Sequence, residues 1–554
     1  MDLNAHFAEL DGWLEQRRQA DGTPGIALAV TDRERLLHVA TAGYADIAAR
    51  RPVAPETLFE TGSIGKSFTA IALLQLADEG RIDLNAPVTE YLPWFALQSD
   101  FAPITLHHLL TQTAGITAGM DFAPEATFQV WALRHQHAAT PPGSFFHYSN
   151  VGYKVLGLVL ERVGGEHYGP AIRRRILDPM GLAASIPTIT NADRPRMAVG
   201  YGPLFDDRPW WPGRPVAPAT WLETDTGDGC LAMPAADLAA YLRMLLNRGA
   251  IPGGRILSDE AFQRMTGRYE PHLTEDESRW YGYGILTHEE DGRAYLGHGG
   301  GMVGYFSSMI GEVGSGLGVV ALVNGPGEPE GIAQAVLDHL VAAAEGQPGA
   351  FPAIVDPHAI DDAAAYAGHY TRIAAVDDTP DETDPSPAVE IEVDGPGLLL
   401  RHPAGAAPLV AYDEGTFVTA DPALDRFFLL FERDAGRVVA FTHGASRYAN
   451  DVDSEPVSAP LPAEWHAYPG LYRSFSPWTP VLRVVRRPAR LHLILMDGPD
   501  GFYMDQPLAP LEDGWFRAGD DERIPERIHF DTIVDGQALR ATLSGCEYYR
   551  VNQL

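Results

Sequence analysis

Residues 59–69 read Phe-Glu-Thr-Gly-Ser-Ile-Gly-Lys-Ser-Phe-Thr, and apolar residues at helical spacing continue from them as far as Gly80. This pattern predicts a helix over residues 63–79 with Ser63 and Lys66 on one face, because positions three apart are neighbours on a helix. A serine hydroxyl becomes a nucleophile when an adjacent base takes its proton, and a neutral lysine can do so. Ser-x-x-Lys alone is also compatible with a helix-capping serine followed by a surface lysine.

Lysine usage bears on these two interpretations without deciding between them. The chain has 41 basic residues, and only Lys66 and Lys154 among them are lysines. Arginine keeps its proton in proteins, whereas a desolvated lysine can become a neutral amine. Retention of a lysine three residues after Ser63 therefore favours a catalytic pair over a surface charge.

Two later segments carry residue types that would complete such a site. Tyr148-Ser149-Asn150 precedes a predicted helix, where a phenol beside a lysine can relay protons and the Asn150 amide can both donate and accept. His298-Gly299-Gly300-Gly301 follows a predicted strand. Its glycines would let the backbone approach a substrate and present an N–H group to an oxyanion.

Ser-x-x-Lys, Tyr-x-Asn and His-x-Gly, in this order, resemble the motifs of the penicillin-recognising serine hydrolases. That group comprises class C β-lactamases, DD-peptidases, D-aminopeptidases and related esterases. The flanking segments agree, including Leu109-Leu110-Thr111-Gln112-Thr113-Ala114-Gly115. The resemblance covers residues 1 to about 346.

The resemblance implies Ser63 as the acylated nucleophile, Lys66 as its base and Tyr148 as the proton shuttle to the leaving group. Asn150 would orient the substrate. His298 replaces the third-motif lysine of the β-lactamases, so recognition of a β-lactam carboxylate is not expected to be efficient.

The oxyanion hole implied by the resemblance consists of the backbone N–H groups of Ser63 and Gly301, with Gly300 beside them. Two residues of the Leu-Leu-x-His-Thr-Ser-Gly segment also differ from the family, because Gln112 and Ala114 stand in place of histidine and serine. We expect these two differences to affect local packing.

Strand-like segments open and close the first part of the chain, at residues 25–30, 36–42, 294–296, 306–311 and 317–323. Helical patterns lie between them, so residues 1–346 are predicted to form an α+β catalytic domain with an antiparallel sheet flanked by helices. A Gly/Pro-rich linker is predicted at 347–361.

Beyond the linker, short alternating strands predict two all-β, barrel-like domains, at 362–458 and 459–554. The segment Tyr366-Ala-Gly-His-Tyr370 recurs as Tyr468-Pro-Gly-Leu-Tyr472, 102 residues later, and we interpret it as the start of each domain. A coincidental match between such short segments is the alternative.

This layout resembles bacterial D-aminopeptidase, in which a loop from the last domain enters the catalytic cleft and restricts substrates to small ones with a free amine. Residues 496–505 are our candidate for that loop. Trp210 and Trp211 are interpreted either as cleft-lining residues or as anchors of a buried loop. Cys230 is expected to be a small buried residue.

Composition limits the partners. The formal charge of −33 disfavours nucleic acid and anionic membranes as partners. The resemblance implies a small molecule or a short peptide as the substrate. No cofactor and no metal are predicted. His107-His108 and His135-x-His137 are interpreted as solvent-facing helix histidines. Residues 1–19 do not resemble a signal peptide, which predicts a cytoplasmic protein, and self-association into a homo-oligomer is left open.

The leading hypothesis is a serine peptidase or amidase of D-aminopeptidase type. A carboxylesterase is the alternative within enzymes, because the same scaffold also hydrolyses activated esters. An alternative of another class is a non-catalytic sensor that binds a β-lactam or a peptide. The proton-relay residues Lys66 and Tyr148 argue against this sensor.

Overall fold

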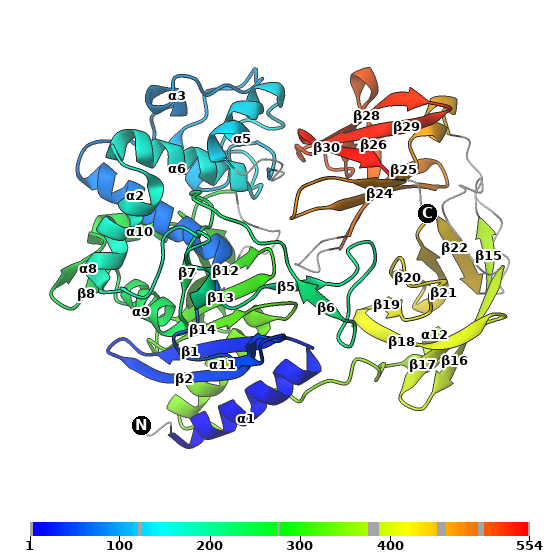
Figure 1. The fold of residues 1–554 in the computed structure, drawn as a ribbon, viewed down its shortest axis with the longest axis horizontal. Coiled ribbons are helices and arrows are strands. Elements are labelled where there is room, and N and C mark those ends of the chain that lie inside the picture. Colours follow the sequence, from blue (N-terminus) through cyan, green and yellow to red (C-terminus); the bar gives the residue numbers. More distant parts are fainter. Residues whose placement is uncertain are drawn as a thin grey trace. The chain divides into compact units, whose positions relative to one another are not determined.

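The computed structural model of the protein describes residues 4–119, 125–271, 273, 278–374, 387–450, 461–496 and 503–551. The chain divides into two compact units (Figure 1). Unit 1 contains Met1–Gly202, Val216–Ala353 and Glu522–Glu526. Unit 2 contains Pro203–Pro215, Ile354–Asp521 and Arg527–Leu554.

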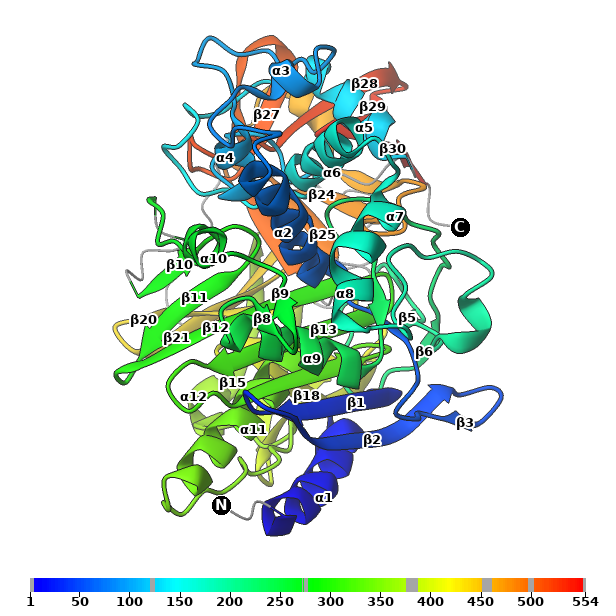
Figure 2. The same ribbon diagram turned by 90° about the vertical axis from the view of Figure 1, so that its left-hand side faces the viewer.

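Unit 1 is built on an eight-stranded antiparallel sheet. The blue N-terminal strands complete a sheet that is otherwise green (Figure 2), so both ends of the unit meet in it. The strands in spatial order are β10 (Arg279–Tyr281), β11 (Leu286–Glu290), β12 (Arg293–Met302), β13 (Tyr305–Glu312), β14 (Gly318–Val323), β1 (Gly25–Thr31), β2 (Leu36–Asp46) and β3 (Arg51–Pro52).

The neighbouring strands β1 and β14 form the core of this sheet. They pair in register from Ile26 opposite Val323 to Thr31 opposite Gly318, and every residue of both strands is buried. Near-continuous apolar sequences without polar alternation are what a strand covered on both faces requires. The sequence predicted five of the eight strands and missed the short β3, β10 and β11.

Close contacts at glycines show which elements cover each face of the sheet. A side chain at Gly299 would collide with Glu330 of α11 (Pro329–Ala344), and a side chain at Gly311 would meet Leu246 of α9 (Ala235–Leu246). Gly299 pairs with Ser308, which is three residues from Gly311, so the two glycines point to opposite faces. The helix α11 therefore covers one face and α9 the other.

The helix predicted over 63–79 exists with a different start. A one-turn 3-10 helix (Gly62–Ile64) leads into α2 (Gly65–Asp78), which is buried on almost every side. A helix that is apolar around its whole circumference belongs in the interior of a domain. The other helices of unit 1 are α1 (Asn4–Ala20), α3 (Val88–Tyr91), α4 (Leu106–Leu110), α5 (Ala126–Ala132), α6 (Asn150–Gly164), α7 (Tyr168–Ile172), α8 (Asp178–Met180) and α10 (Asp259–Met265).

Unit 2 contains two closed antiparallel barrels of eight strands each. The first comprises β15 (Gly368–Ala374), β16 (Ala388–Asp394), β17 (Gly397–His402), β18 (Gly405–Asp413), β19 (Thr416–Thr419), β20 (Leu429–Asp434), β21 (Arg437–His443) and β22 (Ser446–Asn450). The second comprises β23 (Gly470–Arg473), β24 (Val481–Arg487), β25 (Arg490–Met496), β26 (Tyr503–Pro510), β27 (Trp515–Ala518), β28 (Arg527–Val534), β29 (Gln537–Leu543) and β30 (Cys546–Arg550). The predicted α+β domain followed by two all-β barrels is confirmed.

The repeated Tyr-x-Gly-x-Tyr segment performs the same structural task in both barrels. The Tyr370 hydroxyl donates to the Tyr366 carbonyl oxygen at 2.8 Å, and the Tyr472 hydroxyl donates to that of Tyr468 at 2.7 Å. Each segment enters the first strand of its barrel at the glycine. The repeat is therefore structural and not coincidental.

Among the described residues, no helix is long and apolar enough to cross a membrane.

Candidate active site

Ser63 and Lys66 meet where the 3-10 helix passes into α2. The Lys66 side-chain nitrogen Nζ lies 2.9 Å from Ser63 Oγ, and the lysine side chain is fully buried. Two further acceptors surround it, Asn150 Oδ1 at 2.7 Å and the Asp228 carbonyl oxygen at 2.9 Å. The surface-lysine alternative is therefore excluded.

The three hydrogen-bond partners of Lys66 suit both its neutral and its protonated form. A neutral lysine amine has two N–H bonds and one lone pair, whereas an ammonium has three N–H bonds. The amine can donate to Asn150 and Asp228 while its lone pair faces the Ser63 hydroxyl. After proton transfer, the ammonium can donate to all three oxygens. The same geometry thus suits the amine before and after it accepts a proton.

Glycines allow the backbone around Ser63 to pack this closely. Gly62 has φ of +52°, and a β-carbon there would lie 2.7 Å from Gly301 N. A β-carbon at Gly300 would lie 2.9 Å from Ser63 N, and one at Gly65 would lie 2.9 Å from Gly229 Cα. The predicted oxyanion-hole residues Ser63, Gly300 and Gly301 are consequently in direct backbone contact.

The start of α6 places Tyr148 and Asn150 beside Lys66. Ser149 caps this helix, since its hydroxyl accepts from Gly152 N at 3.1 Å and donates to the Thr117 carbonyl oxygen at 2.7 Å. Asn150 therefore begins the first turn, where it reaches Lys66. The centroid of the Tyr148 ring lies 4.8 Å from Lys66 Nζ.

His298 completes the cluster from β12. Its ring centroid is 6.4 Å from that of Tyr148. Its Nδ1 donates to the Gly299 carbonyl oxygen at 2.5 Å, which leaves Nε2 to accept from the Tyr281 hydroxyl at 3.1 Å. Burial lowers the pKa of His298 to about 4, and the nearby Lys66 charge acts in the same direction. His298 is thus a neutral imidazole at neutral pH.

Lys154 was noted in the sequence only as the second lysine, and the structure places it next to the same site. It follows Asn150 by one helical turn of α6 and is 3% exposed. Its Nζ donates to Gln129 Oε1 at 2.9 Å and lies 3.6 Å from Asp228 Oδ2. Asp228 therefore contacts both lysines of the chain, Lys66 through its carbonyl oxygen and Lys154 through its carboxylate.

Gln112 bonds to the segment that contains Tyr148, so its presence in place of the family's histidine affects more than local packing. Its backbone φ is +60°, its side-chain oxygen accepts from Ser149 N at 2.9 Å, and its carbonyl oxygen accepts from His147 N at 2.8 Å. The glutamine side chain thus bonds directly to the Tyr-x-Asn backbone.

Glu526 is a residue that sequence reasoning missed. It belongs to the short segment Glu522–Glu526 of unit 1, which follows β27 and precedes β28 in the chain. Its Oε1 accepts from Ala118 N at 2.8 Å and lies 3.0 Å from His147 Nε2. The Ala118 carbonyl oxygen in turn accepts from Asn150 N at 2.8 Å. Glu526 therefore contacts His147, which precedes Tyr148 in the chain, and Ala118, which bonds to Asn150.

Three other sequence interpretations have different outcomes. In the loop predicted at 496–505, residues 497–502 lie outside the described residues. Trp211 packs in unit 2 against a cluster that includes Val410 and Phe428, so it is a loop anchor. Cys230 is fully buried and donates to the Pro187 carbonyl oxygen, and burial raises its thiol pKa.

The histidine pairs are only partly as predicted. His135 and His137 are exposed. His107 and His108 are half-buried and do not face solvent, because His107 Nδ1 lies 2.7 Å from the Tyr283 hydroxyl and His108 completes the capping box of α4. Burial lowers the pKa of both of these imidazoles.

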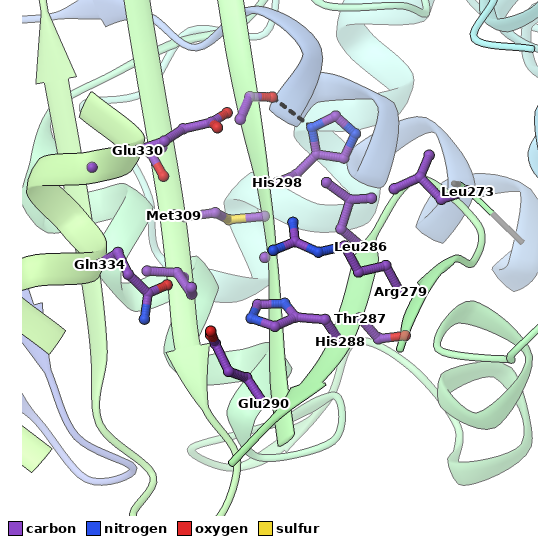
Figure 3. A pocket seen from close by; sticks show the side chains of 15 residues that line it. Leu273, Arg279, Leu286, Thr287, His288, Glu290, His298, Met309, Glu330 and Gln334 are labelled. Carbon is purple, nitrogen blue, oxygen red and sulfur yellow. Dashed lines mark hydrogen bonds between the residues drawn. The ribbon is translucent and has the colours of Figure 1, made fainter. Parts of the chain in front are cut away.

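A cavity of about 400 Å³ lies on the α11 side of β12 (Figure 3). Charged and polar side chains from β10, β11 and α11 line it, including Arg279, His288, Glu290, Glu330 and Gln334. The Gly299 position, which has room for the Glu330 carboxylate because it lacks a side chain, lies at its edge. His298 also lines this cavity, and Gly300 lies against Ser63.

Comparisons with known proteins agree with this geometry. A family model described as Beta-lactamase matches residues 10–343. Penicillin-binding protein 4 of Amycolatopsis lactamdurans is 29% identical over 397 residues, which cover 67% of this chain and 98% of that protein.

Two solved structures are similar as well. A D-stereospecific amidohydrolase from Streptomyces sp. has a TM-score of 0.50 and 26% identity, over 60% of this chain and 97% of that one. The octameric penicillin-binding protein homologue from Pyrococcus abyssi has a TM-score of 0.56 and 24% identity, over 80% of this chain and 99% of that one. At 24% identity, the similarity to the Pyrococcus abyssi protein shows a shared fold only.

Proposed function

We propose, from the premise that this chain belongs to the Beta-lactamase family of serine hydrolases, that it hydrolyses the amide bond of a small substrate through an acyl-enzyme on Ser63. The observation that carries this proposal is the position of Lys66 Nζ, 2.9 Å from Ser63 Oγ and bonded to two further oxygens. A buried amine so held is a base ready for one particular proton.

In the proposed mechanism, Ser63 Oγ attacks the substrate carbonyl carbon while its proton passes to the neutral Lys66 amine. The carbonyl oxygen becomes an oxyanion that accepts from the N–H groups of Ser63 and Gly301. Tyr148 delivers a proton to the leaving amine, and the C–N bond breaks to give the acyl-Ser63 ester. Water then attacks this ester with the same residues acting in reverse, and Ser63 regains its proton.

His298 bears on the substrate class. As a neutral imidazole it supplies no fixed cation where a third-motif lysine would stand, so a free carboxylate on the substrate has no counter-charge from it. The chain's charge of −33 favours a substrate with an ammonium group. The likeness to a D-stereospecific amidohydrolase supports an amide of a D-amino acid. We therefore propose D-aminopeptidase-like activity.

Carboxylester hydrolysis is the second candidate. The neutral His298 accommodates an uncharged ester as well as an amide, and an alkoxide leaving group needs less help from Tyr148 than an amine does. The ratio of kcat/KM for a D-alanine anilide to that for a short-chain phenyl ester distinguishes the two activities. A sensor that only binds its ligand would show no turnover beyond one equivalent with either substrate.

The test of the nucleophile is covalent labelling with a fluorophosphonate, followed by mass spectrometry. We expect one adduct per chain, on Ser63, and none on the Ser63→Ala variant. Absence of an adduct on the wild type, or an equal adduct on the variant, would contradict the proposal. A panel of D- and L-amino-acid amides then assigns the stereochemical preference.

Two organisational points remain predictions. We propose a catalytic domain that ends near residue 346 and two barrel domains that meet near residue 458, and limited proteolysis with mass spectrometry tests these boundaries. Light scattering of the purified chain tests for a homo-oligomer.

A further inference from the structure

The helices α1 and α11 of unit 1 bring together two histidines and a glutamate that play no part in the proposed reaction. His6 and Glu9 are three residues apart on α1, so they lie on one face of that helix, and His339 lies on α11. His6 Nδ1 is 3.0 Å from His339 Nε2. One ligand atom from each of the three side chains lies within 4.8 Å of the others.

These residue types and spacings suit a divalent transition metal. Zinc binds imidazole nitrogen at about 2.0–2.1 Å and carboxylate oxygen at about 2.0–2.2 Å, in a tetrahedron whose neighbouring ligand atoms are about 3.3 Å apart. The two imidazole nitrogens already stand close to that separation. Glu9 is exposed, so its carboxylate can close the third position with a small change of rotamer while water takes the fourth.

His339 is held in one orientation by its surroundings. It is 3% exposed, and its ring stacks on Phe351 with centroids 4.1 Å apart. A ligand ring fixed by packing needs little rearrangement when an ion binds.

A hydrogen bond between two neutral imidazoles also explains the 3.0 Å distance between His6 and His339. This hydrogen bond gives no role to the Glu9 carboxylate, which lies within reach of both rings.

The surrounding contacts show which parts of the fold a metal here would hold together. Trp13 of α1 stacks on Phe351 and donates to the Pro352 carbonyl oxygen at 3.0 Å. The first helix of unit 1, its closing helix and the segment after that helix therefore already converge at this point.

We infer that His6, Glu9 and His339 form a zinc site that fastens α1 to α11, the first and last helices of unit 1. The site is independent of the Ser63 chemistry, since it uses none of those residues. No sequence pattern predicts this site, because 333 residues separate His6 from His339.

The test is the zinc content of the full chain. Chelator-treated protein is dialysed against about 10 μM zinc chloride at pH 7.5 and its metal is counted by plasma mass spectrometry. We expect one zinc per chain for the wild type and no uptake of magnesium, which prefers oxygen ligands. His6→Ala and Glu9→Gln should each weaken zinc binding at least about tenfold. Both residues lie at or near the surface, so both variants should fold.

Three histidines elsewhere serve as controls. His167 is 86% exposed and lies 3.6 Å from Glu161, but it is not part of a group of three candidate ligands among the described residues. His167→Ala, like a variant lacking exposed His135 and His137, should bind zinc as the wild type does. Zinc should also raise the unfolding temperature of the wild type and not that of His6→Ala. A wild type that retains no zinc, or a His6→Ala variant that retains as much as the wild type, would overturn the inference, whatever the protein hydrolyses.

Discussion

The two lysines of the chain occupy neighbouring buried environments that differ in the charge of their partners. Among the described residues, the hydrogen-bond acceptors of Lys66 are a hydroxyl, an amide and a backbone carbonyl oxygen, all uncharged. Lys154 bonds to the amide of Gln129 and lies 3.6 Å from the carboxylate of Asp228. An uncharged shell lets an amine give up its proton, whereas a carboxylate favours the ammonium.

Asp228 makes this comparison unusually direct, because it serves both lysines. Its backbone carbonyl oxygen accepts from Lys66, the base of the proposed mechanism, and its carboxylate lies beside Lys154. Because both lysines are buried, we propose that the charge of their partners, and not burial, distinguishes their roles. The four predictions below test this difference, from the largest expected effect to the smallest.

Replacement of Lys66 by arginine should have the largest effect. Arginine keeps its proton, so Lys66→Arg should lower kcat/KM by at least about 10³-fold on an amide substrate. Lys154→Arg keeps the cation that Asp228 needs and should lose less than about tenfold. Steady-state kinetics on both variants, with circular dichroism to confirm folding, measures the contrast. Equal losses in the two variants would break the comparison.

Removal of the Lys154 charge should destabilise the fold. Lys154→Met leaves the Asp228 carboxylate without its cation, and breaking a buried pair in this way costs about 3–5 kcal/mol in the free energy of unfolding. Urea unfolding at pH 7 measures this loss. The double variant Lys154→Met/Asp228→Asn removes both charges and should recover most of the stability. If the double variant is no more stable than the single one, the ion pair is not what Lys154 contributes.

His298 should make the protein acid-sensitive. Its pKa is lowered to about 4 in the folded protein from an ordinary value of 6.5. Between pH 6.5 and pH 4, the unfolded chain therefore binds a proton on this imidazole that the folded chain does not bind. Stability should therefore fall as pH drops from about 6.5 to about 4, by up to about 3 kcal/mol from this group.

Urea unfolding over that pH range measures the slope, and His298→Asn should make it shallower. A slope unchanged in His298→Asn would show that His298 does not titrate as a buried neutral group.

Glu526 should have the smallest effect, because it touches neither Ser63 nor Lys66. Glu526→Gln weakens charge-assisted bonds to Ala118 N and His147, and we expect kcat/KM to fall about tenfold as the Asn150 backbone loosens. Glu522→Gln in the same segment is the matched control, since Glu522 is exposed. Equal kcat/KM values for the two variants would remove Glu526 from the supports of the site.

Two features of the sequence predicted the sheet of unit 1 and the two barrels of unit 2. The strands β1 and β14 are continuous apolar segments, and the barrel repeat carries a tyrosine pair whose spacing is fixed by one hydrogen bond. Ser63, Lys66, Tyr148, Asn150 and His298 could be nominated because each belongs to a short motif, and the structure brings all five together. Their catalytic roles stay predictions.

The supporting residues could not be predicted, because their contacts depend on the fold. Asp228 reaches Lys66 from 162 residues away, and Glu526 reaches Ala118 from 408 residues away. Neither residue belongs to a motif. For Lys154 a signal did exist, since it is the second of two lysines and stands four residues after Asn150, but its partner Asp228 gave none. The start of α2 was misplaced because Gly62 adopts a left-handed conformation that a periodic pattern does not reveal.

The glycine contacts around Ser63 have a consequence for how this enzyme can diversify. Gly62, Gly65, Gly229 and Gly300 each face backbone so closely that a β-carbon would strike it. Random mutagenesis at these four positions should therefore return almost only inactive clones, whatever substrate is selected for. New specificities therefore have to be sought at positions whose side chains do not meet this closely packed backbone.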